Sequence, residues 1–296
     1  MTNTLMSQLE KAGCVAAARL EPYFPRVRDR DDIAVLIDPL TDVIVLSRFD
    51  HIDLQYYNER SEAEGLTVRN EVVKSPKVED NSRRRAVFGP YIKGKRWLDF
   101  GSGLGGMLDE MAAAADFAVG LEPNEDRAHF CRAKGHKIVP DLQEIEDGSL
   151  DCITLFHVFE HLTDPIGTAQ VLMRKLRPGG TLICEVPHGR DALIQTYESD
   201  SFKAFTFWSE HLVLHTRQSL AGLLKAAGFT SVEVNALQRY PLANHLHWLA
   251  KGRPGGQAQW GFLVADALDR EYEATLSKID RTDTIFALCQ APVVAR

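Results

Sequence analysis

Short apolar runs alternate with polar and amphipathic stretches from residue 95 onward. Runs rich in Val, Ile, Leu and Phe, typical of buried strands, cover residues 96–100, 117–121, 136–139, 151–156 and 181–186. Stretches with helical spacing of their apolar residues fill the gaps between the runs. This alternation predicts an α/β domain built on a mainly parallel sheet.

Four stretches between or after these runs carry signals for helices and their ends. The first two helices are predicted over residues 105–115 and 124–134. The third begins at Asp164, a good N-cap residue that is followed by proline. The fourth follows Thr216 and ends at Gly228, since glycine readily takes the left-handed conformation that closes a helix.

The first 80 residues have a different pattern of apolar and polar residues, and we assign them to an N-terminal accessory or lid region. Two apolar runs around a D-P-L-T-D turn predict a β-hairpin within residues 33–47. A helix is expected near residues 79–92. The main domain is then expected over residues 81–296.

A second irregular segment, residues 239–282, is inserted between two late strands predicted at 231–237 and 283–291. It is rich in Trp, Tyr, His and Gly and holds one predicted helix near residues 261–279. Mixed aromatic and amide side chains suit a lid over a ligand, and a dimer contact is the alternative.

The composition is that of a globular protein, with 45% hydrophobic residues, 25% charged residues and a net charge of −7. Basic residues form no long block, so we expect no nucleic-acid partner. The first residues lack the pattern of a signal peptide, and no run is long enough to span a membrane. The five cysteines are scattered, which favours reduced thiols and a cytoplasmic location.

The stretch LDFGSGLGG joins the first strand of the domain to its first helix. Gly101, Gly103 and Gly106 satisfy G-x-G-x-x-G, and Glu122 follows at the end of the next strand. Any adenosine-containing cofactor suits this pattern, including the dinucleotide of an oxidoreductase. Asp99 distinguishes a dinucleotide from a cofactor with an ammonium group, because a carboxylate there repels a pyrophosphate but attracts an ammonium group. Its alternative role is to hold loop amides.

Five motifs together resemble class I S-adenosylmethionine-dependent methyltransferases. They stand in the family's order and are WLDFGSGLGG, GLEPN, LDCITLFHVFEHLTDP, LRPGGTLICEVP and HLVLHTRQSLAGLLKAAGF. The resemblance implies a Rossmann-like seven-stranded sheet, helices on both faces, an antiparallel last strand, and S-adenosylmethionine as cofactor. It covers roughly residues 80–238 plus the final strand.

The resemblance also implies which residues hold the cofactor. Gly101, Ser102, Gly103 and Gly105 match the loop around the methionine part, with Asp99 nearby. Glu122 matches the residue that binds the ribose. The other matching positions are Pro123 and Asn124 beside the adenosine, Asp141 and Leu142 near the adenine, and Phe156 and His157 closing the site.

The stretches FHVFEHLTDP and HLVLHT resemble the small-molecule branch near ubiquinone and sugar methyltransferases. We therefore expect methyl transfer to a small polar metabolite, first of all a sugar or polysaccharide-precursor hydroxyl or carbon. Three alternatives stay open: a quinone or phenol O-methyltransferase, an NAD-dependent oxidoreductase, and a cofactor-binding module without turnover. A homodimer is also possible.

Three histidines are candidate catalytic residues, because a hydroxyl acceptor attacks well only once it is deprotonated. They are His157 at the end of the fourth strand, His211 just before the fourth predicted helix, and His245 in the insertion.

In ubiquinone-pathway relatives an E-x-x-E-H stretch is associated with a divalent metal. Here His157 takes the first position, ahead of Glu160 and His161. Three such residues share one face if they form a helical turn. We nevertheless expect no metal site, and predict that Glu160 and His161 form a structural turn.

The run Arg83, Arg84 and Arg85 is interpreted as a solvated helix face. An alternative is that these arginines, together with Tyr56 and Tyr57, cover the cofactor or meet an anionic substrate.

Overall fold

The computed structural model describes residues 4–52 and 78–293, so Tyr56 and Tyr57 lie outside it. The strands are β1 (Glu21–Phe24), β2 (Val35–Asp38), β3 (Val43–Leu46), β4 (Arg96–Phe100), β5 (Phe117–Leu121), β6 (Ile138–Val139), β7 (Leu150–Phe156), β8 (Leu176–Pro187), β9 (Val213–Leu214), β10 (Thr230–Leu237) and β11 (Thr284–Gln290). The α-helices are α1 (Thr4–Lys11), α3 (Val78–Ile92), α4 (Gly106–Met111), α5 (Glu125–Ala133), α6 (Pro165–Lys175), α7 (Ala192–Gln195), α8 (Asp200–Thr206), α9 (Arg217–Ala227), α10 (Leu242–Lys251), α11 (Gly256–Gln259) and α12 (Asp266–Lys278). Single 3₁₀ turns are η1 (Ala17–Arg19), η2 (Ala112–Ala114), η3 (Leu142–Glu144), η4 (Phe159–His161) and η5 (Gly261–Leu263).

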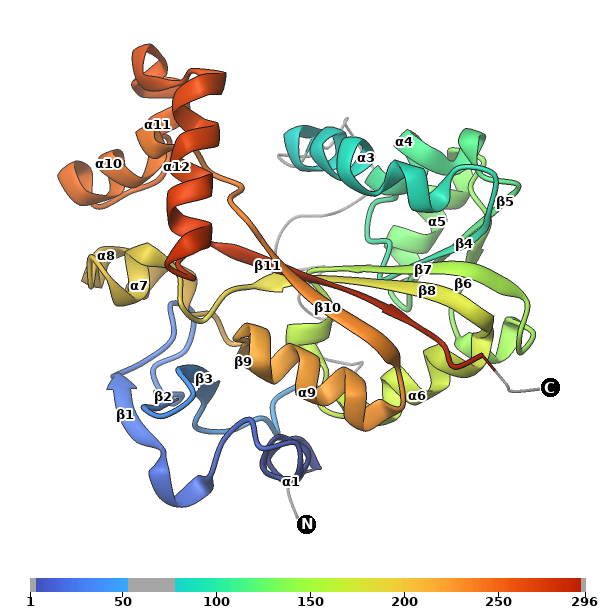
Figure 1. Cartoon of the computed structure of the whole chain (residues 1–296), viewed down its shortest axis with the longest axis horizontal. Coiled ribbons are helices and arrows are strands. Elements are labelled where there is room, and N and C mark those ends of the chain that lie inside the picture. Colours follow the sequence, from blue (N-terminus) through green and yellow to red (C-terminus); the bar gives the residue numbers. More distant parts are fainter. Residues whose placement is uncertain (1–3, 53–77, 294–296) are drawn as a thin grey trace.

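The central sheet has the strand order β10-β11-β8-β7-β4-β5-β6. Neighbours from β8 to β6 run parallel, whereas β11 runs antiparallel to both β8 and β10. In Figure 1, α3 and α4 lie on one side of the sheet and α6 and α9 on the other. The predicted α/β class, the seven-stranded sheet and its antiparallel last strand are confirmed.

The predicted helix ends are confirmed at α5, α6 and α9. The side chains of Asn124, Asp164 and Thr216 each accept a backbone N–H three residues ahead. Such bonds satisfy N–H groups that the first helical turn leaves unpaired. Gly228 closes α9 with a φ of 106°. These caps fix where each helix leaves the sheet, and therefore where the loops at the strand ends lie.

The N-terminal residues build a second, smaller sheet in the order β1-β2-β3-β9. β2 and β3 form the predicted hairpin, and Ile44 of β3 pairs with Leu214 of β9, which belongs to the main domain. Leu5 and Leu9 of α1 are buried where this helix contacts α6 and α9. Residues 4–52 thus share a sheet and an apolar core with the main domain, and the role of the N-terminal region as a lid stays a prediction.

The insertion folds into α10, α11, η5 and α12, which stand beyond the ends of β10 and β11 (Figure 1). Helix α12 matches the predicted helix, but α10 was not predicted. Its buried face carries Asn244, His245 and His247, and these polar residues interrupt the apolar periodicity that identifies a helix. Within the described ranges, no helix is both long and apolar enough to cross a bilayer.

Candidate functional site

A cavity of about 1130 Å³ opens at the carboxyl edge of the parallel strands. Its walls include the loops after β4, β5, β7 and β8, which meet there because parallel strands end at one edge. The N-terminal region contributes Arg28 and Ile52, and helix α10 contributes Asn244, His245 and Trp248. One continuous space therefore joins the glycine loop to the insertion.

The glycine loop forms one wall of this cavity. Gly101, Gly103 and Gly105 have φ values of 76°, 55° and 76°, a left-handed conformation that other residues adopt at a cost. A Cβ atom on Gly101 would lie only 2.6 Å from Cγ2 of Val158. Gly101 and Gly103 line the cavity, whereas Gly105 is the N-cap of α4 and is not among the lining residues.

Glu122 holds this loop against the end of β5. Its Oε2 accepts a hydrogen bond from the Gly103 amide at 2.8 Å, and its Oε1 accepts one from the Asn124 amide at 2.9 Å. Burial raises the pKa of Glu122, and two backbone donors partly offset that effect. The structure therefore fixes a buried carboxylate at the cavity wall, where the sequence predicts a ribose-binding residue.

Asp99 is the second buried carboxylate at this wall. Its Oδ1 accepts a 2.8 Å hydrogen bond from Thr154 Oγ1, which in turn accepts one from Trp97 Nε1 at 3.0 Å. Burial raises the pKa of Asp99 to about 6. This side chain is therefore anchored on β7, and a positively charged ligand group beside it would favour its ionised form.

Ser102 allows a direct test of whether this wall suits the expected cofactor. Its Oγ is buried and has no hydrogen-bond partner among residues 4–52 and 78–293. A buried polar atom without a partner costs about 1–3 kcal/mol, which a polar ligand can recover. With Asp99, Glu122 and the glycine backbone beside it, this hydroxyl fits the ammonium and hydroxyl groups of S-adenosylmethionine.

The remaining expected cofactor residues divide into two groups. Pro123, Phe156 and His157 line the cavity. Asp141 instead caps η3, by accepting the Gln143 amide at 2.7 Å, and Leu142 packs against the main core. Neither of these lines the cavity, and neither does Asn124, which caps α5. Adenine contacts from Asp141 and Leu142 therefore stay predictions.

His157 follows β7 with a φ of 56°, which is left-handed and costly for a residue other than glycine. Its Nδ1 lies 3.2 Å from Glu160 Oε1, and its Nε2 lies 3.1 Å from Arg239 Nη1. A guanidinium group can only donate hydrogen bonds, so Nε2 must accept. In this arrangement the ring hydrogen lies on Nδ1 and points toward Glu160.

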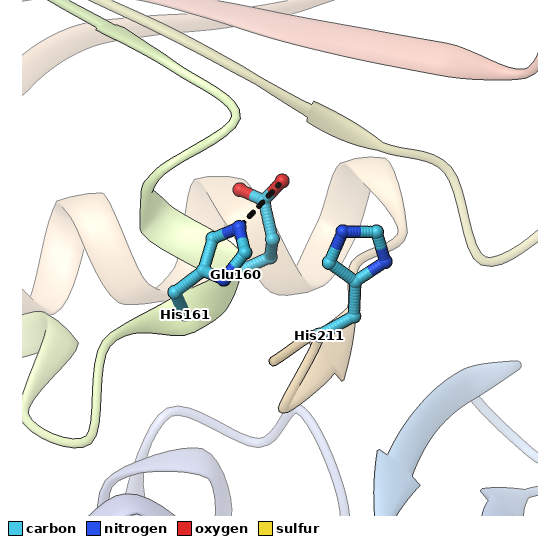
Figure 2. A group of neighbouring side chains, drawn as sticks. All are labelled: Glu160, His161 and His211. Carbon is cyan, nitrogen blue, oxygen red and sulfur yellow. Dashed lines mark ion pairs between the residues drawn. The ribbon is translucent and has the colours of Figure 1, made fainter. Parts of the chain in front are cut away.

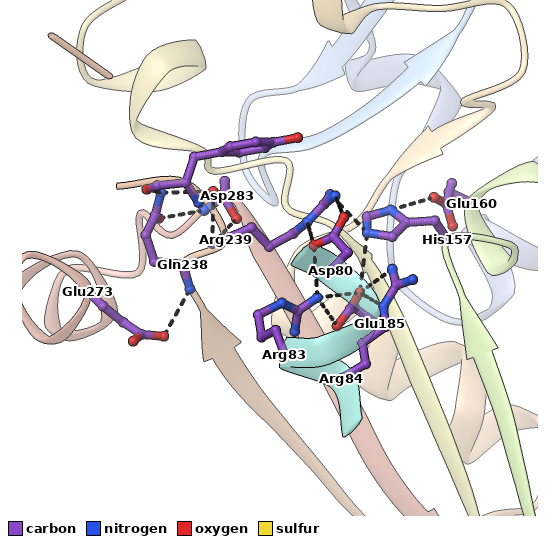
Figure 3. Close-up of polar contacts among 11 residues, drawn as sticks. Asp80, Arg83, Arg84, His157, Glu160, Glu185, Gln238, Arg239, Glu273 and Asp283 are labelled. Carbon is purple, nitrogen blue, oxygen red and sulfur yellow. Dashed lines mark hydrogen bonds and ion pairs between the residues drawn. The ribbon is translucent and has the colours of Figure 1, made fainter. Parts of the chain in front are cut away.

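A network of charged side chains surrounds His157 (Figure 3). Arg84 donates to the buried Glu185 at 2.6 and 2.9 Å, and Arg83 donates to it at 2.9 Å. Asp80 accepts from Arg239 Nε at 3.1 Å and also pairs with its Nη2. Burial alone would raise the pKa of Glu185, but Arg84, His157 and Arg83 hold it well below its usual range. The expectation of a solvated face is therefore wrong for Arg83 and Arg84.

Glu160, His161 and His211 form a second cluster beside this network (Figure 2). Glu160 and His161 belong to the turn η4, as predicted, whereas His211 comes from the loop before β9. One nitrogen or oxygen from each residue lies within 4.8 Å of the others. Both histidines line the cavity.

The charge states of this cluster follow from burial and from its neighbours. Burial alone would raise the pKa of Glu160, but the hydrogen bond from His157 and the nearby histidines lower it to about 2. Burial, and then His161, lower the pKa of His211 to about 3. At neutral pH the cluster therefore holds one carboxylate and a neutral His211.

His245 lines the cavity but has both ring nitrogens engaged. Its Nδ1 lies 2.7 Å from Tyr272 Oη, and its Nε2 lies 3.1 Å from Gln238 Nε2. Burial lowers its pKa to about 4. The contact with Tyr272 of α12 holds the ring in the cavity wall, and a catalytic role for His245 stays a prediction.

Besides Arg28, the charged residues that line the cavity without having been predicted there are Arg127, Asp191, Glu210, Arg239 and Asp283. Arg84 lines it too, which agrees with the alternative interpretation of the arginine run. Burial, and then Asp283, raise the pKa of Asp191 well above its usual range. Arg239 and Asp283 flank the insertion at the ends of β10 and β11. Sequence reasoning could have found Arg239 and Asp283 from this position, because these strand ends lie at the same edge of the sheet as the glycine loop.

Comparisons with known proteins agree with this geometry. A family model described as a methyltransferase domain matches residues 77–234, which is 158 of the 296 residues. The chain is 28% identical over 184 residues to a demethylmenaquinone methyltransferase of Clavibacter sepedonicus, covering 52% of this chain and 73% of that protein. It is 30% identical over 99 residues to a ubiquinone biosynthesis O-methyltransferase of Aromatoleum aromaticum, covering 30% of this chain and 42% of that protein.

Among solved structures, an S-adenosylmethionine-dependent methyltransferase from Archaeoglobus fulgidus matches with a TM-score of 0.52. It is 22% identical, and the match covers 79% of this chain and 99% of that one, which shows a shared fold. The family match covers more than half of the chain and sets aside the oxidoreductase alternative. This chain belongs to the methyltransferase-domain family and is an S-adenosylmethionine-dependent methyltransferase.

Proposed function

We propose that this protein methylates a hydroxyl group of a small ring compound bound between His157 and helix α10. The observation that carries the proposal is the single cavity, which joins the glycine loop to a wall of histidines, arginines and aromatic rings. Donor and acceptor can meet there without crossing the protein surface, and closeness of this kind provides much of the acceleration of a displacement reaction.

The cofactor occupies the glycine-loop end in this proposal. Glu122 binds the ribose hydroxyls, Asp99 the ammonium group, and the backbone of residues 101–103 the methionine part. Pro123 flanks the adenosine, and Asn124 supports this wall by capping α5 behind it. S-adenosylmethionine supplies a methyl group bonded to a positively charged sulfur. The sulfur is a good leaving group because of this charge. The residues of this chain bind it, orient it and exclude water.

The acceptor occupies the other end, with the insertion as its outer wall. Trp208, Tyr240 and Trp248 line this end together with polar Asn244 and His211. His211 faces the acceptor from this wall. His157 and Arg239 position the acceptor from the cofactor side, and His245 holds α10 in place.

Two acceptor classes suit this wall. A phenol or quinol is supported by the aromatic lining and by the named relatives, a demethylmenaquinone methyltransferase and a ubiquinone biosynthesis O-methyltransferase. A sugar or polysaccharide-precursor hydroxyl, the first expectation from the sequence, is supported by the polar side chains of Asp191, Asn244 and Asp283. We place the phenolic acceptor first, because two independent observations support it.

The test is acceptor-dependent release of S-adenosylhomocysteine, measured against matched panels of phenols, quinols and sugar nucleotides. We expect turnover with at least one phenol or quinol, and its loss in Glu122→Ala. Turnover confined to sugars would reverse the order of the two classes. Tight cofactor binding without release across both panels would instead indicate a cofactor-binding module.

A further inference from the structure

The cluster of Glu160, His161 and His211 contains buried atoms whose hydrogen-bonding capacity the protein leaves unused. Within residues 4–52 and 78–293, Glu160 Oε2 and His211 Nδ1 are buried and have no hydrogen-bond partner. Glu160 is only 1% exposed. A carboxylate oxygen can only accept, so the missing partner of Glu160 Oε2 is a hydrogen-bond donor or a cation.

We propose that Glu160, His161 and His211 bind a divalent cation of the zinc and cobalt type. Two imidazoles and one carboxylate form a donor set that late first-row metals prefer, and three protein ligands leave a coordination position open. His161 and His211 both line the cavity, so the open position faces the acceptor end. The cation would therefore meet the acceptor and not the cofactor loop.

The spacing of the donor atoms suits a metal after a small adjustment. His161 Nε2 lies 3.7 Å from Glu160 Oε1, and all three donors fall within 4.8 Å. Bonds of 2.0–2.1 Å at a tetrahedral angle place ligand atoms about 3.4 Å apart. Rotation of the side chains would have to bring the donor atoms closer by at most about 1.4 Å, the difference between 4.8 Å and 3.4 Å.

The ligand set differs from the one that the sequence spacing offers. His157 stands three residues before Glu160, but its Nε2 accepts from Arg239 and its Nδ1 donates to Glu160. It therefore has no lone pair left for a metal. His211, 50 residues beyond His161 in the sequence, takes the third position through the fold. Replacing an oxygen donor by a second imidazole shifts preference away from magnesium and toward zinc or cobalt.

A second carboxylate lies near one of the ligands. Glu210 Oε2 lies 4.0 Å from His161 Nδ1, the ring nitrogen that does not approach Glu160. Metal-binding histidines commonly direct their other ring nitrogen to a carboxylate, and a small movement of Glu210 would bring it within hydrogen-bond distance. The unused atoms of Glu160 and His211 are the observation that points to a cation.

The experiment is calorimetric titration of the metal-free full-length protein with Zn²⁺ and with Mg²⁺, and it does not depend on turnover. We expect one Zn²⁺ per chain, with affinity at least 100-fold higher than that for Mg²⁺. Titration with Co²⁺ should give visible absorption typical of nitrogen and oxygen ligands, without a thiolate band. Absence of saturable Zn²⁺ binding, or an affinity for Mg²⁺ equal to that for Zn²⁺, would overturn the proposal.

Variants locate the site. His211→Ala and His161→Gln should each weaken Zn²⁺ binding at least tenfold, whereas His157→Asn should change it less than threefold. Exposed His129→Ala is the control for nonspecific binding to surface imidazoles. Unchanged far-ultraviolet circular dichroism of the metal-free proteins shows that each variant is folded. Loss of Zn²⁺ in His157→Asn with retention in His211→Ala would contradict the proposed ligand set.

Discussion

His157 Nε2 lies 3.1 Å from Arg239 Nη1, and this contact determines which ring nitrogen carries the hydrogen. The same Nε2 lies 3.4 Å from Glu185 Oε1, so a protonated ring would turn to the carboxylate and lose the bond from Arg239. Arg239 is paired with Asp80 and is held in place. The lone pair of His157 is therefore committed to a neighbouring side chain in the absence of an acceptor.

The tautomer of His157 can be observed directly by ¹⁵N NMR of the imidazole ring near neutral pH. We expect a protonated Nδ1 and an unprotonated Nε2, because the guanidinium of Arg239 supplies the only hydrogen of that contact. Arg239→Ala should move the Nε2 resonance, while Arg28→Ala should leave it in place. A hydrogen on Nε2 in the unmodified protein would show that Glu185 and not Arg239 is its partner.

Glu185 should be among the residues most important for stability. It is fully buried and paired with Arg83 and Arg84, so Glu185→Gln leaves two guanidinium groups short of a countercharge. We expect the free energy of unfolding in urea to fall by about 3 kcal/mol. The matched control is Glu110→Gln, since the Glu110–Arg85 pair is more exposed and should contribute less than about 1 kcal/mol. Equal effects of the two substitutions would contradict the network shown in Figure 3.

Cofactor affinity should depend on pH through Asp99. Burial raises the pKa of this carboxyl to about 6, and only its ionised form attracts the ammonium group of the ligand. Affinity should therefore be highest above pH 6 and fall by up to about tenfold for each unit below it. Titrations of S-adenosylhomocysteine between pH 5 and 8 measure this. Asp99→Asn should bind more weakly and lose this part of the dependence, whereas a parallel decline in both proteins would assign it to another group.

Alanine substitutions at two glycines distinguish the cost of backbone strain from the cost of a steric clash. Gly101 and Gly148 have φ values of 76° and 69°, but only a Cβ on Gly101 meets a neighbour, Val158, while one on Gly148 meets nothing within 4 Å. Gly148→Ala should cost about 1–2 kcal/mol of unfolding free energy, the usual cost of left-handed strain. Gly101→Ala should cost clearly more and should also weaken cofactor binding. Equal losses in urea unfolding would show that Val158 moves aside freely.

Local signals in the sequence were sufficient for most of the central sheet. The strands at 96–100 and 117–121 have the predicted bounds, because each is a continuous apolar run bordered by polar residues. The caps at Asn124, Asp164 and Thr216 are equally local, since a capping side chain bonds to a neighbour three residues away. Such features need no knowledge of distant contacts.

Contacts between distant segments account for what the sequence did not reveal. Arg84 and Glu185 are 101 residues apart, so the arginine run resembles a solvated helix face until the sheet brings β8 beneath it. His211 reaches Glu160 only because β9 pairs with β3 of the N-terminal sheet and lies beside η4. Spacing along the chain assigned His157 to that group instead, although the fold directs its ring to Arg239.

The central claim is that the wall formed by Asp99, Ser102 and Glu122 binds S-adenosylmethionine. Calorimetric titration with S-adenosylhomocysteine tests it most directly, because binding is measured without knowing the acceptor. We expect one molecule bound per chain and an affinity roughly 10- to 100-fold lower in Glu122→Ala, the range for hydrogen bonds to a charged group. Glu125→Ala, an exposed substitution nearby, should bind as the unmodified protein does. Absence of binding by the unmodified protein, or equal affinity in Glu122→Ala, would contradict the account.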